Sequence, residues 1–135
     1  MTLRLTPYLM LDGTAQEAIR FYEKALQAKV LFKQSFGEGP DPVPEEARAR
    51  ISHAVLSLGE AELYIADSAP GQSSRQGDQV QVCITSPDIE KTNQLFDSLR
   101  QEGQVIEPIG QTHFSPAYAL VTDRFGVTFQ LFTRR

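Results

Sequence analysis

Apolar and polar residues alternate along several short segments of this chain, and a period of two is typical of half-buried β-strands. Two longer segments instead repeat their apolar residues every three or four positions, as amphipathic helices do. In the first half, the pattern predicts strands at 3–11, 29–36, 51–58 and 62–67 and a helix at 14–27. In the second half, it predicts strands at 79–85, 104–109, 117–122 and 127–132 and a helix between 86 and 103.

The expected helix ends have recognisable sequence signals. Thr14 and Glu17 have the spacing of a capping box. Ser86 is a favourable N-cap with Pro87 at the first helical position, and Gly103 is a typical helix terminator.

Each half of the chain therefore has the order strand, helix, three strands. Between the halves, residues 68–78 are rich in Ser, Gly, Gln and Pro, a composition typical of a linker. We predict one domain of two βαβββ modules, about 1–67 and 79–135, of the α+β class. A curled mixed sheet would surround a cleft, with the helices outside.

The last predicted hairpin carries an unusual polar residue. Asp123 to Gly126 form its turn, since Asp favours a turn through its side chain and Gly accepts a positive φ. Beyond the turn, Gln130 shares a strand face with Thr128 and Phe132. Such a face would look into a cavity or into water.

Composition narrows the function classes. The chain has 135 residues, 41% of them hydrophobic and 22% charged, and a net charge of -4, which suit one globular domain without a nucleic-acid partner. Apolar runs stay short of the ~20 residues of a membrane helix, so we expect a cytoplasmic protein without a membrane partner. Cys83 is the single cysteine and lies in an alternating segment, which predicts a buried structural thiol.

Six segments together resemble one known family. In chain order they are Pro7–Gly13, Ala18–Tyr22, Pro42–Glu46, Ile51–Ala54, Asp67–Gly71 and Thr122–Gly126. They resemble the PhnB-like family of the vicinal oxygen chelate superfamily, which includes glyoxalase I, extradiol dioxygenases, fosfomycin resistance proteins and bleomycin-binding proteins. The resemblance implies paired βαβββ modules, often in a homodimer. Members are often labelled as relatives of a ubiquinone-pathway methyltransferase, but Leu11-Asp12-Gly13-Thr14 has one Gly where a cofactor-binding fold has a Gly-rich turn.

The resemblance also implies four metal-ligand positions, on the first, fourth, fifth and eighth strands. Counted along this chain, they fall on Pro7 (beside Tyr8), on 63–65, on Val82 and on Gln130. Among these positions, only Gln130 has a side chain that can bind a divalent ion. One amide oxygen is too few ligands to hold such an ion. We therefore expect no metal ion or other cofactor, and no glyoxalase or dioxygenase chemistry by the shared mechanism.

His53 lies in the middle of a predicted strand, on the face of Ile51, Val55 and Ser57. It is either a structural histidine satisfied by a neighbour or a ligand or general base that faces the cleft. The strand tyrosines belong either to the core or to a pocket, and His113 either covers the cleft mouth or is an exposed loop residue. The candidate ligand-binding residues are Tyr8, His53, Tyr64, His113, Phe114, Tyr118 and Gln130.

Three functions fit these residues. The first is metal-free binding of a small organic ligand in the cleft between the modules. The second is a lyase, isomerase or transferase, with a non-standard metal or acid/base set around the candidate catalytic residues His53 and Gln130 and a carboxylate such as Asp67 or Glu107. The third is an assembly role with dimerisation as its purpose. The sequence favours the first and leaves open whether the protein is an enzyme.

Overall fold

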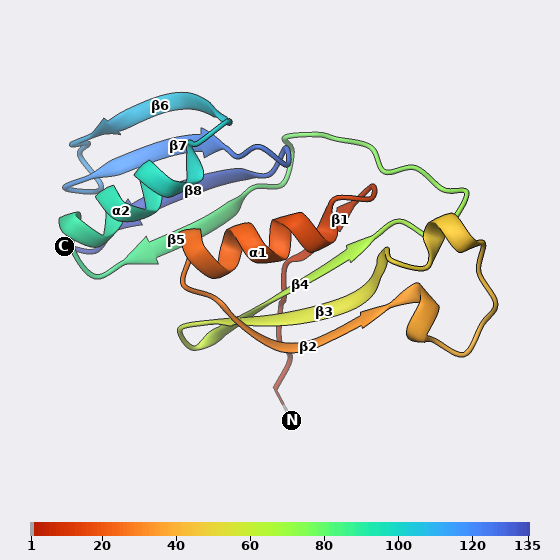
Figure 1. The fold of residues 1–135 in the computed structure, drawn as a ribbon. Coiled ribbons are helices and arrows are strands. Elements are labelled where there is room, and N and C mark those ends of the chain that lie inside the picture. The colour runs from red at the N-terminus through yellow and green to blue at the C-terminus, as the bar shows by residue number, and fades with distance from the viewer. Residues whose placement is uncertain (1) are drawn as a thin grey trace. The chain divides into compact units, whose positions relative to one another are not determined.

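The computed structural model describes residues 2–135, and the chain divides into two compact units after Arg75 (Figure 1). Within the described residues, each unit contains one α-helix and one four-stranded mixed sheet. The α+β class and the repeated order of elements are confirmed. That the two units make up one domain stays a prediction.

The first unit has its sheet in the order β1-β4-β3-β2, with β1 parallel to β4 and the other pairs antiparallel. Its elements are β1 (Tyr8–Leu11), α1 (Ala15–Ala25), β2 (Lys29–Ser35), β3 (Ile51–Leu58) and β4 (Ala61–Asp67), with 3₁₀ turns at Phe36–Glu38 and Glu45–Ala47. The core combines one stripe of α1 with one face of the sheet. Its fully buried members include Ala18, Ile19, Tyr22, Ala54, Leu56 and Ile65.

The second unit repeats this arrangement with the order β5-β8-β7-β6. Its elements are β5 (Val82–Ser86), α2 (Ile89–Leu99), β6 (Gln104–Gly110), β7 (Tyr118–Thr122) and β8 (Thr128–Thr133). Again one face of the sheet is buried with the helix. The buried residues include Leu95, Phe96, Leu99, Ala119, Val121, Phe129 and Leu131.

Thr14 is the N-cap residue of α1 as predicted but lacks the predicted capping bond, and the predicted N-cap of α2 at Ser86 is wrong. The Thr14 side chain forms no capping hydrogen bond; instead, Oδ1 of Asp67 accepts the N–H groups of Gly13 and Ala15, at 2.7 and 3.0 Å. In the second unit Asp88 is the N-cap and accepts the N–H of Lys91 at 2.8 Å. Side chains that lie nearer to the first helical N–H groups satisfy them in both helices.

Several predicted boundaries also shift. The first strand begins at Tyr8 rather than at residue 3, because Pro7 offers no N–H to the ladder. Leu3 and Leu5, which precede the strand, are fully exposed. Helix α1 ends at Ala25, and Gln27 already has a φ of +56°. The larger of the other shifts are a later start of β5, at 82 rather than 79, and an earlier end of α2, at 99 rather than 103.

The predicted β7–β8 turn is confirmed. Oδ1 of Asp123 accepts the N–H groups of Phe125 and Val127, at 2.9 and 3.0 Å, and Gly126 has a φ of +86°. Beyond the turn, Leu131 is buried while Gln130 stays partly exposed. The alternation of β8 therefore separates a covered face from an open one, as predicted.

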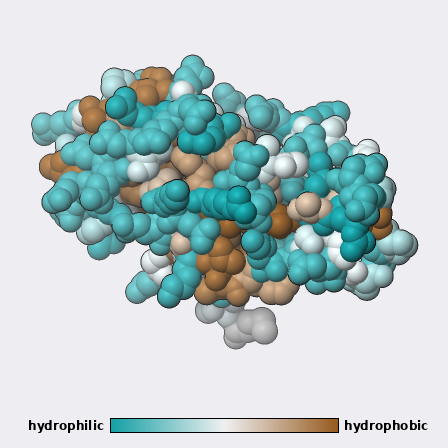
Figure 2. All heavy atoms as spheres, in the orientation of Figure 1, coloured by the Kyte–Doolittle hydropathy of each residue, from teal (hydrophilic) through white to brown (hydrophobic). Residues whose placement is uncertain are grey.

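Hydrophilic residues cover most of the surface visible in Figure 2, and hydrophobic residues gather there in small patches. Apolar side chains that remain exposed include Tyr8, Met10, Leu31 and Phe32 in the first unit and Ile106 and Phe114 in the second. In the part of the chain described, no helix is both long and apolar enough to cross a membrane.

Candidate functional site

Each sheet has one face buried with its helix and an opposite face, here called the open face. On the first sheet, Tyr8 pairs with Tyr64, Tyr64 with Val55, and Val55 with Phe32. Residues that pair directly across neighbouring strands point to the same side of a sheet. His53, two residues before Val55 on β3, lies on this side too. The predicted binding residues of the first unit therefore share one open face.

These side chains meet in a cluster of Tyr8, Phe32, His53 and Tyr64, which we call the His53 cluster. The His53 ring centroid lies 5.1 Å from that of Tyr64, 5.5 Å from that of Tyr8 and 6.0 Å from that of Phe32. The Tyr8 hydroxyl and His53 Nδ1 form a 2.7 Å hydrogen bond. Each of the four strands contributes one residue, so the cluster exists only once the sheet has formed.

Phe32 was missed by the sequence analysis. A register irregularity between Val30 and Phe32 interrupts the pairing of β2 with β3, so simple alternation does not assign its face. Its exposure of 48% does not distinguish it from neighbouring Leu31, which is 54% exposed; the contact of its ring with His53 does.

The environment keeps the Tyr8 phenol protonated. Burial raises the pKa of Tyr8 above its ordinary value, and the neighbouring Tyr64 raises it further. A neutral phenol can donate a hydrogen bond.

A second cluster lies on the open face of the second sheet and contains Gln81, Phe114, Tyr118, Gln130 and Phe132; we call it the Gln130 cluster. The Tyr118 hydroxyl donates to Gln130 Oε1 at 3.3 Å, and Gln130 Nε2 donates to Gln81 Oε1 at 2.6 Å. The aromatic rings of the cluster pack with centroids 5.1 to 5.5 Å apart. Both ends of the Gln130 amide thus have partners within the chain, which fixes its orientation.

His113 lies at the border of this second cluster. Its ring centroid is 5.1 Å from that of Phe114, and its backbone carbonyl accepts a hydrogen bond from the Arg135 side chain. The phenol of Tyr118 has a raised pKa, first because of burial and then because of the negative charges of Glu107 and Cys83. The candidates of the second unit are therefore also neighbours.

In the strand register, two of the expected metal-ligand positions lie beside an open-face residue rather than on it. Cys83 is the partner of Gln130, whereas Val82 pairs with buried Phe129 and faces the helix. On β1 the open-face position beside Tyr64 is Tyr8, not Pro7. Among residues 2–135, no group of three or more His, Cys, Asp or Glu side chains has the spacing of a metal site.

The prediction of a buried Cys83 is wrong, because this cysteine is exposed. Alternation shows that successive residues face opposite sides, but not which side is covered. Partial burial of the thiol nevertheless raises the pKa of Cys83, an effect that the Thr85 side chain only partly offsets.

We therefore expect Cys83 to react slowly with iodoacetamide at neutral pH despite its exposure. The thiolate is the reactive form, and a raised pKa lowers its fraction. Alkylation in the folded chain should be slower than in the urea-unfolded chain at pH about 7, and it should accelerate as the pH rises. Mass spectrometry gives both rates without ambiguity, since the chain has one cysteine. A folded chain that reacts as fast as the unfolded one would contradict the expectation.

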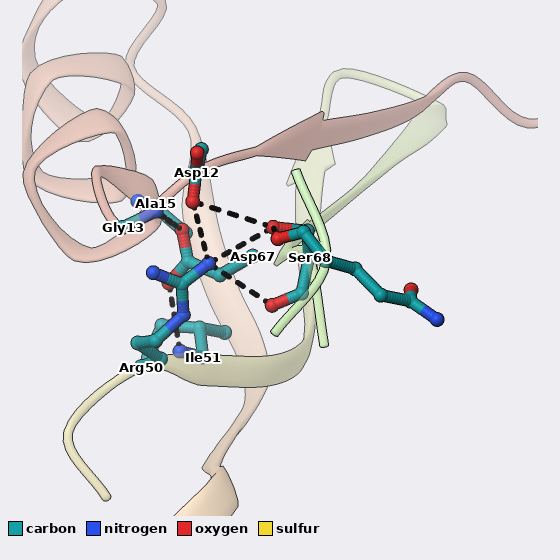
Figure 3. Close-up of polar contacts among 8 residues, drawn as sticks. Asp12, Gly13, Ala15, Arg50, Ile51, Asp67 and Ser68 are labelled. Carbon is teal, nitrogen blue, oxygen red and sulfur yellow. Dashed lines mark hydrogen bonds and ion pairs between the residues drawn. The ribbon is translucent and has the colours of Figure 1, made fainter. Parts of the chain in front are cut away.

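Asp67 does not belong to either cluster. It lies three residues after Tyr64 on β4 and so points to the helix side. Its carboxylate accepts the N–H groups of Gly13, before α1, and of Ala15, the first residue of α1. It also accepts the N–H of Ile51 at 2.9 Å (Figure 3). This buried carboxylate holds three backbone segments together, which argues against its use as the acid/base partner of His53.

Next to Asp67, the Arg50 guanidinium closes the same corner (Figure 3). Its Nη2 donates to Oδ1 of Asp12 at 2.9 Å and to both the carbonyl and the hydroxyl oxygen of Ser68, at 3.0 and 2.9 Å. The carboxylate of Asp67 occupies the N-terminus of α1, the place where a nucleotide-binding fold would hold a phosphate. This junction therefore gives no support to a methyltransferase of that fold.

Known proteins share both the sequence pattern and the fold. A family model described as 3-demethylubiquinone-9 3-methyltransferase matches residues 3–132. Protein PA1353 from Pseudomonas aeruginosa is 26% identical and superposes with a TM-score of 0.91 over 98% of both chains. A putative 3-demethylubiquinone-9 3-methyltransferase, PhnB protein, from Bacillus cereus is 25% identical, with a TM-score of 0.77 over 98% of this chain and 100% of that one.

A more distant match extends the fold to the wider superfamily. The glyoxylase/bleomycin resistance protein/dioxygenase domain from Frankia sp. EAN1pec is 13% identical, with a TM-score of 0.74 over 100% of this chain and 99% of that one. At this identity the match shows the fold alone. The protein therefore belongs to the PhnB-like family described as 3-demethylubiquinone-9 3-methyltransferase and has the glyoxalase/bleomycin resistance-like fold.

Proposed function

We propose that this protein binds a small organic ligand without a metal ion, on the aromatic open faces of its sheets. The observation that carries the proposal is the repeated design of those faces. In each unit, aromatic rings surround a hydrogen-bonding side chain, His53 in one and Gln130 in the other. Apolar walls with a few placed polar groups are the usual composition of small-molecule sites.

The exposure of the rings supports this proposal. Tyr8, Phe32 and Phe114 are each 44 to 48% exposed although all three contact other rings. Apolar surface that stays in contact with water is unfavourable, by roughly 25 cal/mol for each Å². A flat ligand that covers the rings would remove that surface from water and gain this free energy.

The metal-free part of the proposal rests on the side chains that lie on the open face at or beside the four expected ligand positions. These are Tyr8, Tyr64, Cys83 and Gln130, and the neutral Gln130 amide is already bonded to Tyr118 and Gln81. Divalent ions such as Mn²⁺ and Ni²⁺ are held by imidazoles and carboxylates. We further propose that the protein is cytoplasmic and forms a homodimer.

An enzymatic alternative is favoured by one contact, the Tyr8–His53 hydrogen bond. A phenol and an imidazole in direct contact can transfer a proton to or from a substrate. This alternative is a lyase, isomerase or transferase that uses His53, with or without a non-standard metal ion.

A metal titration separates the two functions. We expect no stoichiometric heat when nickel, manganese or zinc is titrated into the wild-type protein, and no change in the His53→Ala variant. Elemental analysis of the purified protein should agree. Stoichiometric binding that disappears in His53→Ala would overturn the metal-free proposal and favour the alternative.

Ligand binding itself is tested by thermal shift with a library of small aromatic compounds. A ligand at 100 times its Kd should stabilise the protein by about 2.7 kcal/mol. The stabilisation should be lost in His53→Ala for a ligand of the first sheet or in Gln130→Ala for a ligand of the second, and retained in Gln94→Ala, a change at an exposed position of α2. A library without any compound of this behaviour would count against the proposed function.

A further inference from the structure

We infer that Tyr8 donates its hydroxyl proton to His53 Nδ1 and so holds His53 in the tautomer protonated at Nε2, which offers Nε2–H to a carbonyl oxygen of a flat, neutral ligand. The inference rests on the proposed binding function and names the ligand chemistry of its first site.

The direction of the hydrogen bond follows from the chemistry of the two groups. A phenol is a better proton donor than a neutral imidazole, and an imidazole nitrogen is a better acceptor than a phenol oxygen. The 2.7 Å separation suits an O–H···N bond. In the opposite direction, the weaker donor would face the weaker acceptor, and the Tyr8 proton would have no acceptor other than water among the contacts of residues 2–135.

The hydrogen bond at one ring nitrogen determines what the other nitrogen can do. With Nδ1 as acceptor, the neutral ring carries its proton on Nε2 and presents one N–H donor there. Within residues 2–135, no hydrogen bond satisfies this Nε2. His53 also lies edge-on to Tyr64, with 75° between the ring planes, and is tilted by 45° from Phe32. The donor is therefore set among aromatic surfaces.

These surroundings select the ligand class. The four side chains of the His53 cluster carry no formal charge when His53 is neutral, so a carboxylate would lose its hydration for a single hydrogen bond. A cation would meet an N–H donor instead of an acceptor. A neutral aromatic ketone or aldehyde offers one acceptor oxygen and a flat apolar body, and so matches both parts of the cluster.

The tautomer can be tested without any ligand. In uniformly ¹⁵N-labelled protein in alkaline buffer, long-range ¹H–¹⁵N spectra report which imidazole nitrogen carries the proton. The chain has two histidines, and a His113→Ala variant assigns their signals. We expect His53 to show an unprotonated Nδ1 and a protonated Nε2, to become a tautomer mixture in Tyr8→Phe, and to stay unchanged in Tyr64→Phe. A proton on Nδ1 in the wild type, or no response to Tyr8→Phe, would overturn the inference.

The ligand class is tested with two probes of matched shape, acetophenone and ethylbenzene. We expect acetophenone to bind about tenfold more tightly, the effect of one hydrogen bond, and to shift the Nε2 signal of His53. The ratio of the two affinities should fall toward one in Tyr8→Phe. Equal affinities would overturn the inference yet uphold ligand binding at the cluster. Failure of both probes to bind a protein with the inferred tautomer would overturn the ligand class and count against the proposed function.

Discussion

Replacement of Asp67 by alanine should lower the free energy of unfolding by about 3–5 kcal/mol. Asp67 is buried, and its carboxylate accepts the N–H groups of Gly13, Ala15 and Ile51. The variant leaves these donors without this partner, and the N–H groups of Ala15 and Ile51 lie where water has little access. Each unsatisfied buried donor costs about 1–3 kcal/mol, and the costs are not strictly additive. Urea unfolding measures the total, and hydrogen exchange should show lost protection at the three amides.

Two further variants identify the cause. Asp67→Asn keeps the shape and an acceptor oxygen for the start of α1, but its amide turns a donor toward the N–H of Ile51, so we expect a loss of about 2 kcal/mol. Asp12→Ala removes a neighbouring carboxylate whose side chain is 50% exposed and which pairs with Arg50; it should cost less than about 1 kcal/mol. If Asp67→Ala costs no more than Asp12→Ala, the carboxylate does not hold this corner together.

The second unit builds the same corner from different chemistry. Asp67 is the last residue of β4 paired with β1, and Thr133 is the last residue of β8 paired with β5. Where Asp67 accepts three backbone N–H groups, Thr133 forms hydrogen bonds with the hydroxyl of Thr92 and with the carbonyl of Ala117, at 2.5 and 2.7 Å. The repeated topology therefore does not require a charge at this position. In the first unit, one carboxylate forms the hydrogen bonds at this position. In the second unit, neutral hydroxyl groups form them.

This comparison shows which features the sequence could predict. Short-range patterns were sufficient for the order of elements and for the Asp123 turn, because the partners lie within four residues of each other. The Asp67 corner was missed because Gly13 and Ala15 are 54 and 52 residues away in the chain. No local pattern marks such a contact. The absence of the predicted capping bond at Thr14 follows from the same limit, since the acceptor of the first helical N–H group is Asp67, on a distant strand.

The candidate sites were predicted to a similar extent. Alternation placed Tyr8, His53 and Tyr64 on strands, but their meeting depends on the strand order and register. Cys83 was assigned to the wrong environment because alternation defines two faces without showing which one the helix covers. For the related reason that a count along the chain carries no register, the expected metal-ligand positions Pro7 and Val82 lie one residue away from the open face.

Replacement of Gly103 by alanine should destabilise the second unit by about 3 kcal/mol. A Cβ at this position would collide with the carbonyl oxygen of Thr122 and lie 3.0 Å from Cα of Asp123. Both are backbone atoms and cannot rotate away. The helix already ends at Leu99, so Gly103 serves the close approach of β6 to β7 rather than helix termination. Urea unfolding, with hydrogen exchange measured separately in 2–75 and 76–135, should show the largest loss of protection in the second range.

Two other glycines separate the collision from the loss of backbone freedom. Gly77 has open space where a Cβ would lie and no positive φ, so Gly77→Ala should change stability by less than about 1 kcal/mol, in the stabilising direction. Gly59 also has open space but a φ of +59°, so Gly59→Ala should cost about 1 kcal/mol through backbone conformation alone. Gly103→Ala should exceed both. If its cost only equals that of Gly59→Ala, β6 and β7 can move apart to accommodate a methyl group, and the close approach does not determine the stability of this sheet.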